Sequence, residues 1–247
     1  MPLIFGVNPL LEALQAKEPL EKIYILAGQR RLAIDKIFSI ARSRKIVIVQ
    51  ADRKKLDHLS GGKNHQGIVA LLPAISYIGL ENLVEKIQKS GRDPNLILAD
   101  RLTDPQNFGA LIRSAEVLGV DGIIFCLKDS TPVTDQVVKA SAGAVFHLDM
   151  CKVTNLARAA EFLQQCGLWI YASSSHAQKS LWEMDFKRPQ AIIIGSEGKG
   201  VRPLLLKRSD EVFRIPQQGK TESLNVSVAA GIIMSEILKQ RGGPKRK

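Results

Sequence analysis

Short apolar runs alternate with polar, glycine-containing loops in the C-terminal part of the chain. Residues 191–194 are apolar and are followed by a glycine, a pattern that predicts a buried strand. Residues 212–215 predict a second strand. Apolar residues then recur at helical spacing from 226 to 237, which predicts a helix capped by Ser223 or Asn225. Two loops thus follow two strands, and the strand ends of an α/β sheet are where ligands bind.

The same alternation begins at Asn95. Residues 96–100 predict a buried strand, and the helix after it has one apolar face and ends at Gly119. Two further strands are predicted at 122–126 and 168–172, and a further helix at 154–165. Strands that alternate with helices are typical of an α/β fold. We therefore expect residues 95–247 to form a mostly parallel sheet with helices on both faces.

Residues 1–75 predict a separate, small α/β domain. Its strands are expected at 22–26, 45–49 and 67–72, and its helices over 32–41 and from Asn8, where Asn8-Pro9 suits a helix start. Residues 76–94 are expected to be a linker between the two domains.

Composition and charge limit the class of protein. The chain has 247 residues, of which 45% are apolar and 24% charged, as in globular proteins with proper cores. It has no apolar run of about eighteen residues, so no membrane span is expected. We expect no secretion signal. Three cysteines without CxxC spacing favour a reducing, cytoplasmic compartment and predict neither a disulfide framework nor a metal site.

The net charge of +11 indicates a polyanionic partner, with RNA as the main candidate. Residues 28–63 hold ten Lys/Arg against three Asp/Glu. These residues form three basic clusters: Arg30-Arg31, Arg42-x-Arg44-Lys45 and Arg53-Lys54-Lys55. The C-terminal tail, residues 239–247, is also basic. Aromatic residues are few, so backbone and shape contacts are expected rather than base stacking. Asn64, His65 and Gln66 are further candidates for RNA contact.

The loop at 195–200 does not match the common nucleotide motifs. Its glycines give G-x-x-G-x-G, and Val201 stands where a P-loop would have lysine. Glu197 is a lone carboxylate directly after a buried strand, which favours a functional loop over a simple tight turn. Arg113 points about 200° away from the apolar Leu111 on its helix, so it is free either to face a cleft or to remain a solvated surface residue.

Three stretches resemble the motifs of the SpoU family of RNA ribose methyltransferases, within the SPOUT superfamily. Residues 107–115 (NFGALIRSA) are similar to the first motif, 193–201 (IIGSEGKGV) to the second, and 215–229 to the third. Residues 4–9 (IFGVNP) and 65–68 (HQGI) resemble the family's substrate-binding domain. The similarity is greatest to the RlmB type, which acts on a guanosine of large-subunit ribosomal RNA.

The resemblance implies S-adenosylmethionine-dependent 2′-O-methylation of a ribose in RNA, with 23S ribosomal RNA as the expected substrate. It also implies a C-terminal trefoil knot, a homodimer, and an RNA site completed by the partner subunit. The implied catalytic residues are Arg113, Asn107, Glu197 and Asn225. The implied cofactor-binding residues are Gly195, Ile215, Ser223 and Leu224. We expect Gly231, inside the last helix, to allow a close backbone approach in the same region.

Other functions stay open at this point. A transfer-RNA ribose methyltransferase shares the same motifs. A non-catalytic RNA-binding factor for ribosome assembly would explain the basic clusters, although not Glu197, Arg113 or the glycine loop. Asn225 also fits a plain helix cap. An NTPase or kinase is disfavoured, because the P-loop lysine is absent.

Overall fold

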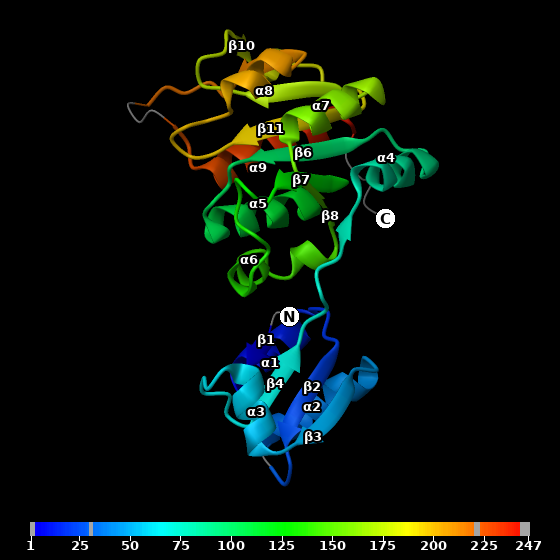
Figure 1. Ribbon diagram of the computed structural model, residues 1–247, viewed down its shortest axis with the longest axis vertical. Coiled ribbons are helices and arrows are strands. Elements are labelled where there is room, and N and C mark those ends of the chain that lie inside the picture. The colour runs from blue at the N-terminus through cyan, green and yellow to red at the C-terminus, as the bar shows by residue number, and fades with distance from the viewer. Residues whose placement is uncertain (1–2, 30–31, 220–222, 243–247) are drawn as a thin grey trace. The chain divides into compact units, whose positions relative to one another are not determined.

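The computed structural model describes residues 3–29, 32–219 and 223–242 (Figure 1). The chain forms two compact units, Met1–Ile75 and Ser76–Lys247. Each unit has its own sheet and its own apolar core, so each is described by itself.

In the residues that the structure describes, unit 1 has a four-stranded sheet and three helices. The strand order is β1-β4-β2-β3; β2 and β3 are parallel, and β4 is antiparallel to both β1 and β2. The strands are β1 Leu3–Phe5, β2 Lys22–Leu26, β3 Val47–Ala51 and β4 Ile68–Leu71, and the helices are α1 Val7–Gln15, α2 Leu32–Ser43 and α3 Arg53–Ser60. The predicted elements are confirmed with small shifts. Helix α1 is capped by Gly6, at φ 96°, and not by Asn8.

A buried histidine holds the turn before β4. His65 Nδ1 accepts a hydrogen bond from the Gly67 amide at 3.0 Å, so its Nε2 carries the proton and donates to Asp57 Oδ1 at 2.9 Å. The side chain is buried, and both ring nitrogens have partners within the unit. The expectation that His65 contacts RNA is therefore wrong. The side chain of Gln66 is also used internally, because its Oε1 accepts from the Val7 amide at 3.1 Å.

Unit 2 is built on an eight-stranded sheet in which every strand pair is parallel. The strand order is β10-β12-β9-β11-β6-β7-β8-β5. The strands are β5 Tyr77–Ile78, β6 Asn95–Asp100, β7 Gly122–Cys126, β8 Asp149–Val153, β9 Trp169–Ser173, β10 Lys179–Ser180, β11 Gln190–Gly195 and β12 Glu211–Arg214. Every residue of β6, β7 and β11 is buried, as apolar strands covered on both faces require. The predicted parallel α/β sheet is confirmed.

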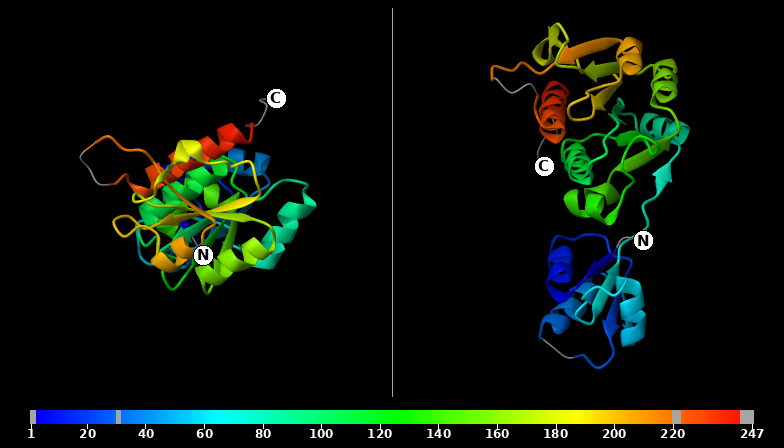
Figure 2. Two further views of the ribbon diagram at one scale, coloured as in Figure 1. Left: turned by 90° about the horizontal axis from the view of Figure 1, so that it is seen from above. Right: turned by 60° about the vertical axis from the view of Figure 1, so that its left-hand side comes forward.

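Helices cover both faces of this sheet (Figure 2). One face carries α4 Leu80–Lys89, α7 Leu156–Gln165 and α8 Pro203–Arg208, which pack on alternate side chains of the strands, such as Leu96, Leu98 and Ile193. The other face carries α5 Pro105–Val117 and α9 Val226–Gln240, which pack against each other. Helix α6 Asp135–Ala140 and the 3-10 turns Ala144–Phe146 and Leu181–Glu183 complete the unit.

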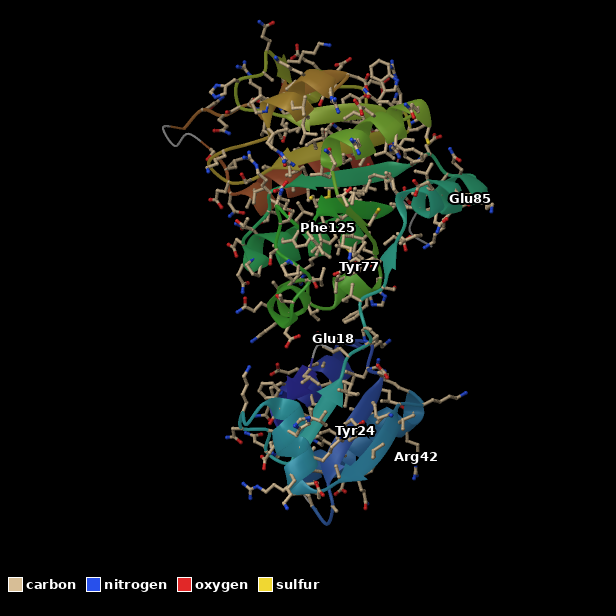
Figure 3. All side chains as sticks on the ribbon, viewed as in Figure 1. Glu18, Tyr24, Arg42, Tyr77, Glu85 and Phe125 are labelled. Atoms are coloured by element: carbon tan, nitrogen blue, oxygen red, sulfur yellow. The ribbon has the colours of Figure 1, made fainter. Side chains whose placement is uncertain are left out.

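Residues 76–94 are not a linker. They form β5, at one edge of the eight-stranded sheet, and α4, whose Leu83, Val84 and Ile87 are buried in the core. Tyr77 of β5 also lies against Phe125 of β7, with ring centroids 6.0 Å apart (Figure 3). The apolar face of α4 requires a partner, so this segment belongs to unit 2, which begins at Ser76.

Within residues 3–29, 32–219 and 223–242, no helix is both long enough and apolar enough to span a membrane. Within the same ranges, no three His, Cys, Asp or Glu side chains gather in a way that would hold a metal ion.

Candidate active site

The loops that carry the site follow the carboxyl ends of the strands in the sheet of unit 2. Strands β6 and β11 are adjacent and parallel, and Asp100 at the end of β6 is in register with Gly195 at the end of β11. A Cβ atom on Gly195 would lie 2.1 Å from the Gly200 carbonyl carbon and 2.2 Å from the Val201 nitrogen. Only glycine tolerates this approach, in which residues 196–200 fold back on the strand end.

Three of the predicted side chains meet beside this loop. Asn107 Nδ2 donates to Glu197 Oε2 at 3.0 Å. Asn225 Nδ2 donates to Asn107 Oδ1 at 2.9 Å and lies 3.3 Å from Glu197 Oε2. The three residues come from α5, the β11–α8 loop and the start of α9. The structure therefore places one carboxylate between two amides that both donate to it.

Asn225 has two functions in the structure. Its Oδ1 accepts from the Ser227 amide at 2.9 Å and from the Ser227 hydroxyl at 2.6 Å, which makes it the N-cap of α9. Its Nδ2 is left to donate toward Asn107 and Glu197. The helix-cap interpretation is therefore confirmed, whereas the catalytic role of Asn225 stays a prediction with which its second contact is compatible.

The start of α5 fixes the position of Asn107. Asp104 caps the helix through the Gln106 amide, at 2.8 Å, and Pro105 follows at the first helical position. Gly109 lets α5 lie directly on α6, because a Cβ there would be 2.4 Å from the Ala140 Cβ. Sequence reasoning gave no role to Gly109, since it is an ordinary helical position until α6 is placed beside it.

Arg113 does not join the three side chains. It lies six residues after Asn107, about 240° around the helix and about 9 Å along it. Its side chain is exposed and has no ion-pair partner among the described residues. The prediction that Arg113 faces away from the apolar face of its helix is confirmed, but the structure does not show it in the cleft.

A cavity of about 250 Å³ lies next to Glu197. All four predicted cofactor-binding residues line it: Gly195, Ile215, Ser223 and Leu224. The part of the loop at 220–222 lies outside the described residues. Sequence reasoning missed residues 173–176, Ser-Ser-Ser-His, which also line the cavity. Ser173 is the last residue of β9, the neighbour of β11, and residues 174–176 follow it; the signal that could have found them is their position at the carboxyl end of a neighbouring strand.

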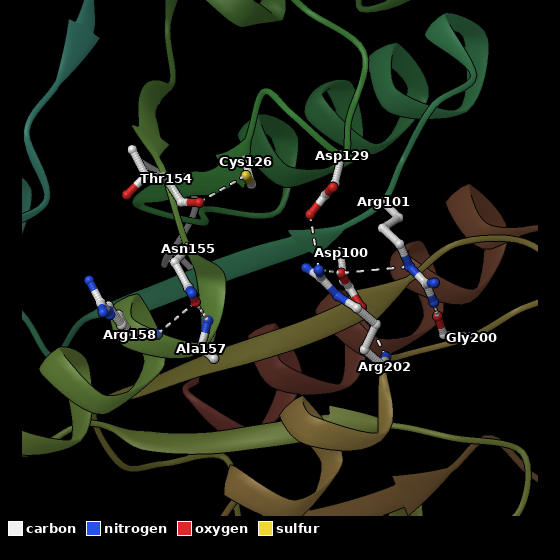
Figure 4. Close-up of polar contacts among 10 residues, drawn as sticks. All are labelled: Asp100, Arg101, Cys126, Asp129, Thr154, Asn155, Ala157, Arg158, Gly200 and Arg202. Carbon is white, nitrogen blue, oxygen red and sulfur yellow. Dashed lines mark hydrogen bonds and ion pairs between the residues drawn. The ribbon is translucent and has the colours of Figure 1, made fainter.

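An ion-pair network holds the C-terminal end of the 196–202 loop in place (Figure 4). Asp100 is fully buried; its Oδ2 accepts from the Arg202 amide at 2.9 Å, and its Oδ1 lies 2.7 Å from Arg202 Nη2. Arg202 Nη1 also pairs with Asp129 at 2.9 Å, and Arg101 Nη2 donates to the Gly200 carbonyl at 3.3 Å. Partial burial acts to lower the pKa of Arg202, but the two carboxylates outweigh it and raise that pKa.

The cysteines belong to the core rather than to the site. Burial, with a contribution from the nearby Glu81 charge, raises the pKa of Cys151 to about 12, so its thiol stays protonated at neutral pH. Cys126 Sγ donates to the Thr154 carbonyl at 3.4 Å.

Comparisons with known proteins identify the family. A model described as "SpoU rRNA Methylase family" matches residues 94–235, and one described as "RNA 2'-O ribose methyltransferase substrate binding" matches residues 3–78. The chain belongs to the SpoU rRNA methylase family. The predicted enzyme class, an S-adenosylmethionine-dependent RNA methyltransferase, is confirmed by this membership.

The similarity to other members of the SpoU family extends over nearly the whole chain. YacO of Bacillus subtilis, named as a TrmH-family tRNA/rRNA methyltransferase, is 34% identical over 96% of this chain and 95% of its own length. The 23S rRNA (guanosine-2′-O-)-methyltransferase RlmB of Pseudomonas aeruginosa is 36% identical over 96% of each chain. A crystal structure of an RNA 2′-O ribose methyltransferase superposes with a TM-score of 0.66, at 27% identity, covering 97% of this chain and 88% of the other.

We expect the two functions of Asn225 to separate in variants. Asn225→Ala removes the cap and should lower the free energy of unfolding by about 1 kcal/mol, whereas Asn225→Ser keeps a capping oxygen and should cost only a few tenths. Both variants lose the amide that donates to Asn107 and Glu197, so methyl transfer should fall by about tenfold or more in both. Urea denaturation and single-turnover methylation measure the two effects. A Ser variant with normal stability and a normal rate would show that the amide is only a cap.

Proposed function

We propose that this SpoU methyltransferase methylates the 2′-hydroxyl of a guanosine in 23S ribosomal RNA. The observation that carries the proposal is the Asn107–Glu197–Asn225 cluster beside the cavity lined by Gly195 and Leu224. The 36% identity to RlmB over almost the full chain favours the ribosomal substrate. A transfer-RNA substrate is the alternative, because the name of YacO covers both kinds of RNA.

The cavity fits S-adenosylmethionine by the chemistry of its lining. Ile215, Leu224 and Val226 offer apolar surface for a purine, and Ser173–Ser175 and Ser223 offer hydroxyls for the polar groups of a nucleoside. Bound there, the cofactor supplies a methyl group on a sulfonium, already activated for transfer. The protein's task is then to hold the ribose oxygen in line and to stabilise its developing charge.

We assign these tasks to the cluster. Asn107 and Asn225 orient the Glu197 carboxylate through their amide N–H groups, and Glu197 accepts the hydroxyl proton or orients a group that does. Arg113 is the proposed phosphate or ribose anchor that stabilises the alkoxide. Arginine is a poor base in general, so we assign the proton to Glu197 in preference to Arg113.

The C-terminal trefoil knot belongs to the same proposal. Two features support it: the tight backbone contact between Gly195 and Gly200–Val201, and the buried Asp100 carboxylate that ties the end of β6 to the amide after that contact. Both are expected where one segment of a chain is threaded closely past another.

A homodimer would complete the site around Arg113. Helices α5 and α9 pack against each other, and their exposed residues include Arg113, Val117 and Val228; the two valines are 70% and 51% exposed. A Cβ on Gly231 would meet nothing within 4 Å, so the expected close approach does not occur inside the subunit. Instead, Gly231 leaves room on the outside of α9, and we propose that a second copy of the chain covers this side and encloses Arg113.

On unit 1 we propose that RNA binds at the end of the sheet where the carboxyl ends of β2 and β3 lie. Strands β2 and β3 are parallel, so Gly28–Gln29 and Arg53–Lys55 follow them at the same end, where Ala27 N donates to Ala51 O. The side chain of Gln29 donates to the Gln66 carbonyl and brings residues 63–66 beside them.

The charges at this end of the sheet favour RNA binding over a role in stability. Arg53, Lys54 and Lys55 occupy the first turn of α3, where cations oppose the helix dipole. Within the described part of unit 1 no carboxylate forms an ion pair with these three cations, so they are free to meet phosphates. In contrast, Arg44 donates to the carbonyls of Leu14, Lys17 and Glu18. Arg30-Arg31 and residues 243–247 lie outside the described residues.

Arg113→Ala should lower the rate of methyl transfer by on the order of a hundredfold or more, to the point where it is effectively abolished. The affinity for the cofactor should stay nearly the same. The exposed side chain of Arg113 makes the change in stability small, under about 0.5 kcal/mol. Arg113→Lys should be nearly as slow, because a point charge cannot replace the planar guanidinium. Calorimetric cofactor titration, melting temperature and single-turnover methylation of RNA test this. A wild-type rate in Arg113→Ala would remove Arg113 from the mechanism.

Val228→Lys should convert a dimer into monomers, because a dimer interface would bury the added charge without a partner. The matched control is Val47→Lys in unit 1, since Val47 is 53% exposed, close to the 51% of Val228. Light scattering behind size-exclusion chromatography measures the mass of both variants. Equal masses for Val228→Lys and the wild type would place any interface elsewhere.

Replacing Arg53, Lys54 and Lys55 together by alanine should weaken RNA binding and lower the salt dependence of the binding constant by about two to three released counterions. The matched control replaces Lys22, Arg42 and Lys45 by alanine, which removes the same charge from the start of β2 and the end of α2, at the opposite end of the parallel strands. Filter binding at several salt concentrations measures both. Equal losses in the two triple variants would indicate a general charge effect rather than a specific surface.

A further inference from the structure

Glu197 stands in a loop that is fixed at two places. At its beginning, Gly195 is paired with Asp100 of β6, at the end of a strand that lies between β6 and β9. At its end, the Arg202 amide donates to the buried Asp100 carboxylate, and the Arg202 side chain returns to the same carboxylate. Between these points, Ser196 and Gly200 bridge each other. The position of Glu197 therefore depends on where residues 200–202 are held.

The turn that presents Asp100 is strained in a way that supports a specific role. Arg101 adopts φ 59°, the left-handed region that a bulky residue rarely occupies. Such strain persists only where the surroundings impose it, and it gathers at functional sites. Here the Arg101 side chain donates to the Gly200 carbonyl while Asp100 holds Arg202. Two consecutive residues of the β6 end thus hold two positions of the same loop.

We infer that Asp100 is a positioning residue for Glu197: by holding residue 202, it fixes the carboxylate of Glu197 against Asn107 and Asn225. The inference rests on the proposed function, in which Glu197 acts at the reacting hydroxyl. Asp100 itself is fully buried and does not line the cavity. Its effect therefore passes through the loop.

A matched control exists at the other end of the sheet. Asp121, just before β7, also has a buried side chain, accepts a backbone N–H from Asn95 at 2.9 Å, and pairs with an arginine, Arg92, at 2.9 Å. Asp100→Asn and Asp121→Asn therefore remove the same kind of carboxylate, one beside the loop and one far from it. Both should lower the melting temperature, but only Asp100→Asn should slow methyl transfer.

The test is a double-mutant cycle in the full-length protein. Asp100→Asn should lower the single-turnover rate at saturating cofactor by on the order of tenfold, because small displacements of reacting groups are costly. In a Glu197→Gln background, the same change should lower the remaining rate by less than about twofold, since residues that act through one another are not additive. Hydrogen exchange of the Arg202 amide should become faster in Asp100→Asn, and not in Asp121→Asn.

Several results would overturn the inference. A wild-type rate in Asp100→Asn would do so, and so would rate losses that multiply in the double variant, because Asp100 would then act independently of Glu197. If Asp100→Asn does not fold, Arg202→Lys takes its place in the same cycle, as it keeps the backbone amide and changes only the guanidinium. A wild-type rate in Glu197→Gln alone would instead contradict the proposed role of Glu197, and the inference with it. If only the coupling between Asp100 and Glu197 is absent, the inference about Asp100 is wrong, but the proposed role of Glu197 is unaffected.

Discussion

The site depends on one backbone contact, the approach of residues 200–201 to Gly195 at the end of β11. Because the chain turns back there without a side chain in the way, the carboxyl edge of the sheet can carry a compact loop instead of an open crossover. Glu197 is presented at the middle of that loop, and α9 is brought close enough for Asn225 to reach it. The contact is therefore the constraint that brings α5, the loop and α9 to one place.

Charge and burial have different roles in the two units. In unit 2 the charged groups at the end of the 196–202 loop are paired, as in the network of Asp100, Arg202 and Asp129, where they fix loop geometry. In unit 1 the cations at the start of α3 are unpaired among the described residues and even oppose the helix dipole. Paired charges specify a conformation, whereas unpaired ones are available to a polyanion, so the two arrangements are suited to chemistry and to RNA affinity respectively.

Much of the fold could be predicted because it depends on local patterns. The buried strands around Leu98 and Ile193 and the apolar face of α5 follow from periodicity, and the motif similarity placed Asn107, Glu197 and Asn225 in one site. What failed depends on contacts distant in sequence. The pair of Asp100 and Arg202, the burial of His65 and the carbonyl contacts of Arg44 join residues whose neighbours appear only once the strand order is known. Residues 76–94 were misassigned because the covering role of α4 is not visible without the sheet it covers.

Both edges of the eight-stranded sheet end in strands of only two residues, β5 and β10. The central strands are almost wholly apolar and, if exposed along an edge, would offer long rows of backbone groups to another chain. The two short edge strands leave few unpaired N–H and C=O groups, and they end the sheet before it can serve as a template for intermolecular strand addition. A highly apolar parallel sheet is thereby kept from seeding aggregation.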